Sequence, residues 1–424
     1  MAATPEKFTG ARPQRTMRVH VHRGADRADA IPAALRQQSV VSDPATIAWV
    51  EDGKAHSLRW QSETGTAPPK KLIVADDRIT ADEAYRLACE GTALLWRGDF
   101  QNARQLLQAM ARRIERKPRK AAAQTTGTRS PPESFPEFFH KYRLAQLQRA
   151  RTLGMLLLPF DDDYRIPLRR APDVAQACVE AYGPANGPFA ASLRELLGVI
   201  GAHEWRKKGV DVPALGARIH PHYGVFAPVR GEYVDLVAKA PLPAGCRLAF
   251  DIGTGTGVLA ALLAQRGVAR ILATDQDPRA LACAAENLAR LGLVTRVETM
   301  AAHLFPDGRA PLIVCNPPWL PGRAGSSLER AVYDPDSRML TGFIGGLADH
   351  LEAGGEGWLI LSDLAEHLGL RTRAELLAAI AAGGLKVAGR MDARPSHPRT
   401  TDSSDPLHAA RAAETTSLWR LALR

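Results

Sequence analysis

The sequence predicts an α/β protein whose carboxyl-terminal half forms a doubly wound parallel sheet. From residue 247 onward, short apolar runs typical of buried strands alternate with helical segments. Such alternation is typical of parallel sheets covered by helices on both faces. The first run, residues 247–252, leads into a glycine-rich turn and then into an apolar helix over residues 258–265. This order of strand, glycine loop and helix indicates a ligand site at the edge of the sheet.

The glycine-rich turn is the first motif that indicates chemistry. Residues 251–257 read Asp-Ile-Gly-Thr-Gly-Thr-Gly. Glycines let the backbone approach a ligand closely, and the N–H groups of the following helix attract negative or polar ligand atoms. The next strand, residues 270–274, runs into Asp275, 22 residues after Gly253. At this spacing dinucleotide-type folds present a carboxylate to ribose hydroxyls. The alternative is a glycine turn in an ordinary α/β protein, with a solvent-facing Asp275.

The second motif is Asn316-Pro317-Pro318-Trp319, which follows an apolar run at residues 310–315. Ligands of open α/β sheets bind outside the strand ends, so we expect Asn316 to face the same crevice as Gly253. An asparagine oxygen accepts one hydrogen bond from a planar NH2 group, and a rigid proline backbone aims a carbonyl at the other hydrogen. Trp319 supplies a flat face for a base or an amide. The glycine turn alone also suits nicotinamide and flavin enzymes, but the pair of motifs predicts methylation of a planar amine.

The pair of motifs resembles the class I methyltransferases that depend on S-adenosylmethionine, in the branch that methylates amines. The resemblance covers roughly residues 218–424 and implies a Rossmann-like, seven-stranded doubly wound sheet whose last strand, residues 416–423, is antiparallel. It implies S-adenosyl-L-methionine as the cofactor. It also implies that the glycine loop holds the methionine part of the cofactor, that the acid after the second strand holds the ribose, and that the asparagine motif holds the target nitrogen.

The resemblance assigns site residues by position. The catalytic candidates are Asn316, Pro317, Pro318 and Trp319. The cofactor-binding candidates are Asp251, Gly253, Thr254, Gly255, Gly257, Asp275, Gln276, Ala302, His303, Phe226, Arg230 and Glu232. Of these, Phe226, Arg230 and Glu232 belong to a segment that caps the cofactor in this branch, or they only brace the fold. His303 departs from the family pattern, because related enzymes often carry an acid there for the adenine amino group; it is an adenine ligand or a surface residue.

The composition agrees with a nucleic-acid partner. The 424 residues carry a formal net charge of +10, with a sequence pI near 9.6, and basic surface attracts polyanions. An arginine-rich proteome would give the same balance. The five cysteines show neither paired nor metal-ligand spacing, so we expect a reducing compartment and no metal site. We find no signal core and no run long enough to span a membrane, which favours the cytoplasm.

The amino-terminal half is expected to be a mainly helical auxiliary region. Residues 1–70 are poorly defined apart from a short hairpin around residues 46–61, and residues 71–117 are predicted to form a helical hairpin. The first helix begins with a capping box at Thr80 and Glu83 and keeps Leu94 and Leu95 on its apolar face. A mobile linker is expected at 118–135, further helices at 136–215, and the catalytic domain at 216–424. The basic stretch from residue 112 to residue 120 either clamps phosphates or is a solvated helix end.

Two segments after the second motif are expected to reach the substrate. Residues 321–327 are rich in Gly, Ser and Arg and could close over it, with residues 333–337 continuing this lid. A polar insertion at residues 393–411 contains His397, Arg399 and His408.

Three functions remain open from the sequence. The leading hypothesis is an N-methyltransferase that acts on an exocyclic base amine, most plausibly of guanine or adenine in ribosomal RNA. The second is methylation of a glutamine amide in a protein such as a translation release factor, since that amide presents the same planar NH2 group. The third is a non-catalytic module with the same fold, which the intact Asn316-Pro317-Pro318-Trp319 motif disfavours. The oligomeric state and the number of methyl groups added are not predicted.

Overall fold

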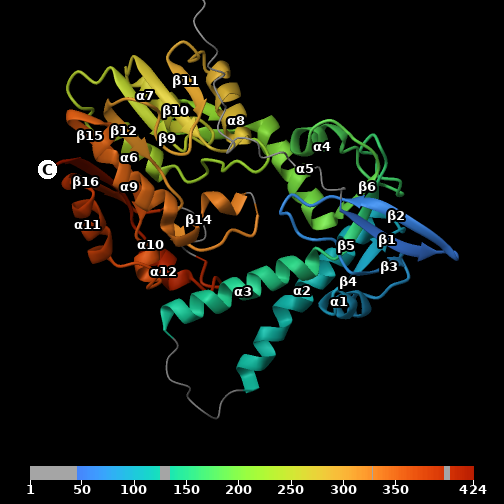
Figure 1. Ribbon diagram of the computed structural model, residues 1–424. Helices are drawn as coiled ribbons and strands as arrows, with labels where there is room; N and C mark the ends of the chain where they lie inside the picture. The colour runs from blue at the N-terminus through green and yellow to red at the C-terminus, as the bar shows by residue number, and fades with distance from the viewer. Residues whose placement is uncertain (1–44, 125–133, 327, 396–401) are drawn as a thin grey trace, which may run out of the picture. The chain divides into compact units, whose positions relative to one another are not determined.

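The structure is a computed structural model that describes residues 45–124, 134–326, 328–395 and 402–424. Its larger compact unit, residues 44–424, contains two main sheets, each with helices packed on it (Figure 1). Among the helices that the structure describes, none is both long and apolar enough to cross a membrane.

The sheet of the carboxyl-terminal half has seven strands in the order β11-β10-β9-β12-β15-β17-β16. All neighbours pair in parallel except the two pairs that involve β17, which are antiparallel. The prediction of a doubly wound sheet with an antiparallel last strand is therefore confirmed. The strands are β9 (Leu248–Ile252), β10 (Arg270–Asp275), β11 (Val297–Ala301), β12 (Ala310–Cys315), β15 (Leu351–Ser362), β16 (Leu385–Ala393) and β17 (Thr416–Leu423).

Alternating side chains of this sheet build two cores, because successive residues of a strand point to opposite faces. On β12, Leu312 and Val314 join the core under α6, α7 and α8, whereas Ile313 and Cys315 join the core under α9 and α11. The burial of both faces of the central strands β9, β10 and β12 explains why their sequences are nearly continuous apolar runs. The helices are α6 (Glu232–Lys239), α7 (Val258–Gln265), α8 (Pro278–Arg290), α9 (Arg338–His350), α10 (Leu364–His367), α11 (Arg373–Ala382) and α12 (His408–Ala413).

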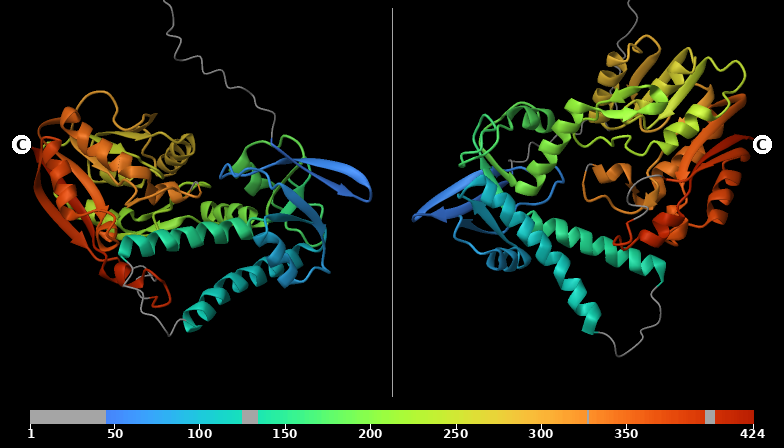
Figure 2. Two further views of the ribbon diagram at one scale, coloured as in Figure 1. Left: turned by 60° about the horizontal axis from the view of Figure 1, so that its bottom comes forward. Right: turned by 180° about the vertical axis from the view of Figure 1, so that it is seen from behind.

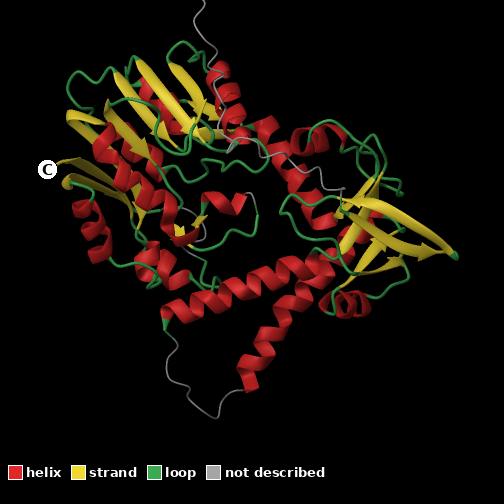
Figure 3. Cartoon of the chain, viewed as in Figure 1, coloured by secondary structure: helices red, strands yellow, loops and turns green. Residues whose placement is uncertain are grey.

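The amino-terminal half corrects the expectation of a mainly helical region. A mixed six-stranded sheet, in the order β1-β2-β6-β5-β4-β3, forms its centre (Figure 3). The expected hairpin at residues 46–61 is present as the antiparallel pair β1 and β2. The strands are β1 (Thr46–Glu51), β2 (Lys54–Trp60), β3 (Lys71–Ala75), β4 (Thr92–Trp96), β5 (Leu156–Phe160) and β6 (Phe189–Ser192), and the helices are α1 (Ala81–Cys89), α2 (Phe100–Gln124), α3 (Phe135–Leu153), α4 (Ala175–Tyr182) and α5 (Leu193–Lys208).

The prediction was wrong there because short buried strands resemble one face of a helix. Every residue of β4 and of β5 is buried, and an apolar run of this length has no period that separates strand from helix. The predicted first helix therefore ends at Cys89, and Leu94 and Leu95 belong to β4 instead. Helices α1 and α2 do pack together, but a strand separates them.

The linker expected at residues 118–135 is also partly wrong, since α2 continues to Gln124 and α3 begins at Phe135; residues 125–133 lie outside the described part. Of the basic stretch that follows residue 111, Arg112 is exposed and Arg113 is paired with Asp82. The side chains from residue 116 to residue 120, like His397 and Arg399, lie outside the described residues.

A short connector joins the two sheets along the chain. It comprises β7 (Val210–Val212), a single turn of 3-10 helix (Pro213–Leu215) and β8 (Ala217–Ile219). A second small pair follows the asparagine motif, in which β13 (Leu320–Pro321) pairs in parallel with β14 (Tyr333–Asp334). Two more 3-10 turns flank β14, at Leu328–Ala331 and Pro335–Ser337. Helix α3 lies alongside this second pair in all views (Figure 2).

Candidate active site

The glycine loop forms a tight turn between β9 and α7. Gly253, Gly255 and Gly257 have φ angles of +71°, +56° and +80°, a region that side-chain-bearing residues seldom adopt. A Cβ atom at Gly253 would lie 2.4 Å from the Cε atom of Met339, so the loop needs glycine there for space as well. At Gly255 no described atom lies within 4 Å of the position where a Cβ would stand. The loop is thus closed on one side by α9 and open at Gly255.

Asp251 and Thr254 hold this loop from behind. The Asp251 carboxylate is buried and accepts hydrogen bonds from the Thr254 hydroxyl at 2.7 Å and from the Ala260 backbone N–H at 3.1 Å. Burial raises the pKa of Asp251 to about 6, against the effect of these two donors. Both side chains were predicted to bind the cofactor, and the structure places them behind the turn, where they fix its shape.

Asp275 stands at the end of β10, beside the open part of the loop. One carboxylate oxygen accepts from the Gly255 N–H at 3.1 Å and the other from the Asp277 N–H at 3.0 Å. Burial raises the pKa of Asp275, and the backbone donors oppose this effect. The Asp275 carbonyl accepts from Ala302 N–H at 3.1 Å, which brings the end of β11 to the same edge. Gln276 and His303 are exposed at this edge.

A buried asparagine that the sequence analysis missed, Asn287, ties the glycine loop to α8. The Asn287 side-chain amide donates to the carbonyls of Thr256 at 3.1 Å and His220 at 3.2 Å, and its oxygen accepts from the His220 N–H at 2.8 Å. Asn287 lies on the apolar stripe of α8, between Ala284 and Leu288. A polar residue in an apolar stripe is the signal that would have identified it, because buried polar groups require partners.

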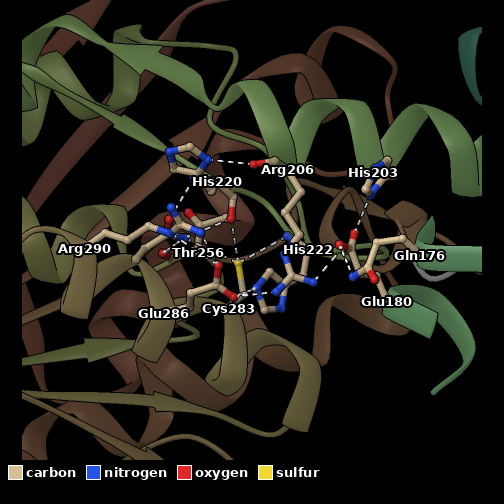
Figure 4. Close-up of polar contacts among 11 residues, drawn as sticks. Gln176, Glu180, His203, Arg206, His220, His222, Thr256, Cys283, Glu286 and Arg290 are labelled. Carbon is tan, nitrogen blue, oxygen red and sulfur yellow. Dashed lines mark hydrogen bonds and ion pairs between the residues drawn. The ribbon is translucent and has the colours of Figure 1, made fainter. Parts of the chain in front are cut away.

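An ion cluster beside Asn287 connects α8 with α5 (Figure 4). Glu286 is its centre, because its carboxylate pairs with Arg206 of α5, with His222 and with Arg290. These donors outweigh burial and lower the pKa of Glu286 to about 2. Burial lowers the pKa of His222, and the Arg206 charge adds to this effect. A polar cavity of about 290 Å³ lies beside the cluster, and its lining includes His203. The carboxylates in this cavity are already paired with cations, so the cluster fastens α5 to the catalytic half.

The target side begins where β12 ends. In the parallel pairing of β12 with β9, Cys315 lies opposite Ile252. The next residues along the two strands are Asn316 and Gly253, so the strand register places the asparagine motif directly beside the glycine loop. Burial raises the pKa of the Cys315 thiol, so the thiol stays protonated at neutral pH and Cys315 serves in packing.

Asn316 and Trp319 hold each other. The Trp319 indole N–H donates to the Asn316 side-chain oxygen at 2.9 Å. The Arg230 guanidinium lies 5.0 Å from the centre of the Trp319 ring, a cation–π distance. Arg230 therefore lies over one face of Trp319, and the half-buried indole also packs against the apolar cores on both sides of the sheet.

Arg230 is itself clamped by two buried carboxylates. It pairs with Glu232 at 2.7 Å and with Glu414 at 3.0 Å, and the side chains of these acids are 6% and 1% exposed. Glu414 also accepts from the Ser362 hydroxyl at 2.6 Å. The structure thus joins Arg230 and Glu232, two cofactor candidates, to Trp319 on the target side. Phe226, from the same segment, is half-buried.

The residues around the glycine loop fit S-adenosylmethionine. The position of a Cβ at Gly255 faces open space, where a ligand could approach the backbone closely, and Asp275 is fixed beside it by backbone donors. Gly253, Gly255 and Asp275 would hold the methionine and ribose parts, with Ala302 and His303 at the adenine end.

Comparisons with known proteins agree with this geometry. Residues 235–372 match the family model of the methyltransferase small domain. The chain is 38% identical over 151 residues to a release factor glutamine methyltransferase from Cereibacter sphaeroides, which covers 34% of this chain and 50% of that protein. It is 39% identical over 79 residues to a tRNA1(Val) adenine-N6 methyltransferase from Parabacteroides distasonis, covering 18% and 33% of the two chains.

The chain therefore spans about half or less of the length of these two relatives. Among solved structures, a ribosomal protein L11 methylase from Lactobacillus delbrueckii subsp. bulgaricus is similar at 19% identity, with a TM-score of 0.32 over 47% of this chain and 83% of that one. Residues 235–372 of the chain thus match the methyltransferase small domain, and the strand order of the carboxyl-terminal sheet agrees with the Rossmann-like fold expected from the sequence.

Proposed function

We propose that the protein transfers a methyl group from S-adenosylmethionine to the nitrogen of a planar amine. One observation carries the proposal: the register of β9 and β12 sets Asn316 beside Gly253, so that the groups for target and cofactor share one edge of the sheet. The bound cofactor would supply an electrophilic methyl group. The role of the protein is to hold the amine and to direct its lone pair toward this methyl group.

Asn316 is the group that we assign to the target nitrogen. Its side-chain oxygen already accepts from Trp319, and a carbonyl oxygen can accept a second hydrogen bond. This second position would take one hydrogen of the target NH2, and the Pro317 carbonyl would take the other. Both hydrogen bonds draw the nitrogen toward a tetrahedral geometry, so its lone pair is no longer delocalised. No strong general base is required for this step.

For the substrate, we propose an exocyclic base amine of RNA. The chain is basic overall, and the segment after the asparagine motif exposes Arg323, Arg330 and Arg338. Arginine side chains around a reacting amine suit a phosphate backbone, because they bind phosphate oxygens whatever the base sequence. The exposed part of the half-buried Trp319 ring would stack on the target base, as aromatic side chains do on single-stranded nucleic acid.

A glutamine amide in a protein is the second candidate. The observation in its favour is that a relative named as a release factor glutamine methyltransferase is 38% identical over 151 residues. A primary amide presents the same planar NH2 group to Asn316. Trp319 does not distinguish the RNA base from the glutamine amide, since both are planar groups that can stack on an indole ring.

The test is transfer of radiolabelled methyl from S-adenosylmethionine into total RNA, ribosomal subunits and soluble protein from cells that lack the gene. We expect the label to be removed by nuclease. Label removed by protease would replace the RNA substrate with the glutamine substrate. If the wild-type protein labels none of the three fractions, and so gives the same result as the Asn316→Ala control, the proposed activity is contradicted.

A further inference from the structure

We infer that α3 of the amino-terminal half forms one wall of the target site, and that Arg143 on this helix is a positioning residue for substrate selection. The inference rests on the proposed function, because it concerns the acceptor of the same reaction. The segment that follows Trp319, residues 320–326 and 328–334, is named the target loop here. It begins with β13 directly after the asparagine motif and ends with β14.

Arg143 makes several contacts to the target loop. Its guanidinium pairs with Glu329 at 2.9 Å and donates to the Arg323 carbonyl at 3.1 Å. The same group lies 3.8 Å from the centre of the Tyr333 ring. The Arg143 side chain is only 13% exposed, so these contacts are shielded from solvent. A planar guanidinium is suited to combine stacking with forked hydrogen bonds.

Glu329 connects Arg143 to the backbone of the target loop. Besides Arg143, its carboxylate accepts from the Gly325 N–H at 2.8 Å. Burial alone would raise the pKa of Glu329, but the hydrogen bond from Arg143 outweighs it and the pKa is lowered. The pair is thus charged at neutral pH, and it ties α3 to the turn of the loop.

Apolar packing extends the same contact. Phe139 of α3 is buried in one cluster with Leu320, and Tyr142 and Tyr333 pack against this cluster. Leu147 lies so close to Gly325 that a Cβ atom there would approach its Cδ2 atom to 2.9 Å. Helix α3 therefore contacts both ends of the target loop and its middle.

The target loop is connected to the sheet edge that carries Asn316 and Gly253. Leu320 follows Trp319 directly and pairs with Tyr333. The next residue, Asp334, is buried and accepts from the Met339 N–H at 2.7 Å at the start of α9, and Met339 touches Gly253. A shift of α3 should therefore act first on the target loop beside Asn316, because the glycine loop is held separately by Asp251 and Asp275.

The experiment compares Arg143→Ala with Arg149→Ala. Arg149 is the matched control, because it lies on the same helix but pairs with the exposed Glu115. The acceptor is total RNA or soluble protein from cells lacking the gene, whichever the wild-type protein labels. We expect Arg143→Ala to raise KM for this acceptor about tenfold, the scale of a lost hydrogen bond between charged groups, with the Kd for S-adenosylmethionine changed less than twofold. Arg149→Ala should match the wild type.

Two further variants separate positioning from general damage to the fold. Arg143→Lys keeps the charge but loses the planar fork, so it should show part of the KM increase. The charge swap Arg143→Glu with Glu329→Arg should recover part of what Arg143→Glu loses. Equal KM values for Arg143→Ala, Arg149→Ala and wild type would overturn the inference, as would an equal loss of cofactor binding and acceptor use.

Hydrogen exchange of the target loop gives a readout that needs no acceptor. Arg143→Ala should speed exchange of the backbone amides over residues 322–334, whereas Arg149→Ala should leave them unchanged. Unchanged exchange in Arg143→Ala would overturn the inference. If the wild-type protein labels neither fraction, the proposed function fails, and the exchange measurement still decides whether α3 holds the loop.

Discussion

The cofactor side and the target side of this site are built in different ways. The cofactor side comes mainly from one stretch of chain, from β9 to His303 just after β11, and many of its contacts join near neighbours such as Asp251 and Thr254. Met339 of α9 closes it on one side. The target side combines α3, the capping segment, the asparagine motif and Glu414, which lies 184 residues from its partner Arg230. The cofactor site can therefore be recognised from a local sequence motif, whereas the target site depends on contacts between distant parts of the chain.

The two sides also differ in their buried charges. On the cofactor side, Asp251 is buried among neutral donors. On the target side, Arg230 is held between two buried carboxylates. Asp336 and Ser337 add backbone strain there, with φ angles of +58° and +52°. We therefore expect substitutions on the target side to change stability as well as activity, and those on the cofactor side to change mainly binding and pH dependence.

The largest effect is expected from Arg230→Met. This change leaves the carboxylates of Glu232 and Glu414 buried without their cation, which costs about 3 to 5 kcal/mol of unfolding free energy. The control is Arg290→Met, because Arg290 is half-exposed and its partner Glu286 keeps the Arg206 guanidinium and a hydrogen bond with His222. The control should cost about 1 kcal/mol or less. Urea unfolding measures both, and equal losses would mean that the Arg230 clamp adds no particular stability.

A pH effect is expected from Asp251. Its folded-state pKa of about 6 lies above the ordinary value of 3.8, so its contribution to stability is complete below pH 3.8 and is lost as the pH rises through 6. A shift of this size corresponds to about 3 kcal/mol. Asp251→Asn should keep the two hydrogen bonds, and it should remove the loss of stability that the wild type shows as the pH rises. Its stability relative to wild type should therefore rise between pH 4 and pH 8. Parallel stability curves would contradict the assignment.

A smaller effect is expected from Gly253→Ala. A left-handed backbone costs a residue with a side chain about 1 to 2 kcal/mol, and the added methyl group would displace Met339. Cofactor affinity should fall about tenfold, and adding Met339→Ala should restore only part of it. Gly267→Ala is the control, since its φ is also positive but nothing lies within 4 Å. Calorimetric titration should show that only Gly253→Ala weakens cofactor binding.

The smallest effect is expected from Ser337→Gly. Glycine relieves the left-handed strain before α9, which should raise stability by up to about 1 kcal/mol. Ser337→Ala keeps the strain, so it should give no gain. A chemical denaturation curve for each variant measures the difference, and a gain in both would mean that the strain is not the cause.

Much of the catalytic half could be predicted from sequence because its signals are local. The boundaries of α7, β12 and β17 agree with the expected ones. The amino-terminal sheet could not be predicted, because β4 pairs with β5 across an interval of some sixty residues that contains α2 and α3. Its apolar residues have no period that distinguishes a short strand from a helical face.

The site follows the same division. Gly253, Asp275 and Asn316 lie where strand ends must meet in a parallel sheet, so their proximity follows from the motif order. Arg143 and Glu414 carry no motif, and only tertiary contacts bring them to Tyr333 and Arg230. The stacking role expected of Trp319 stays a prediction, and Arg230 already lies over one face of its ring.

The most direct test of the central claim is a single-turnover comparison of Asn316→Ala with wild type, together with cofactor binding by calorimetry. The claim is that Asn316 holds the target nitrogen and takes no part in binding the cofactor. It predicts a methyl-transfer rate reduced by about a hundredfold, the scale of one lost transition-state contact, with an unchanged Kd for S-adenosylmethionine. A near wild-type rate, or a loss of cofactor affinity as large as the loss of rate, would contradict it.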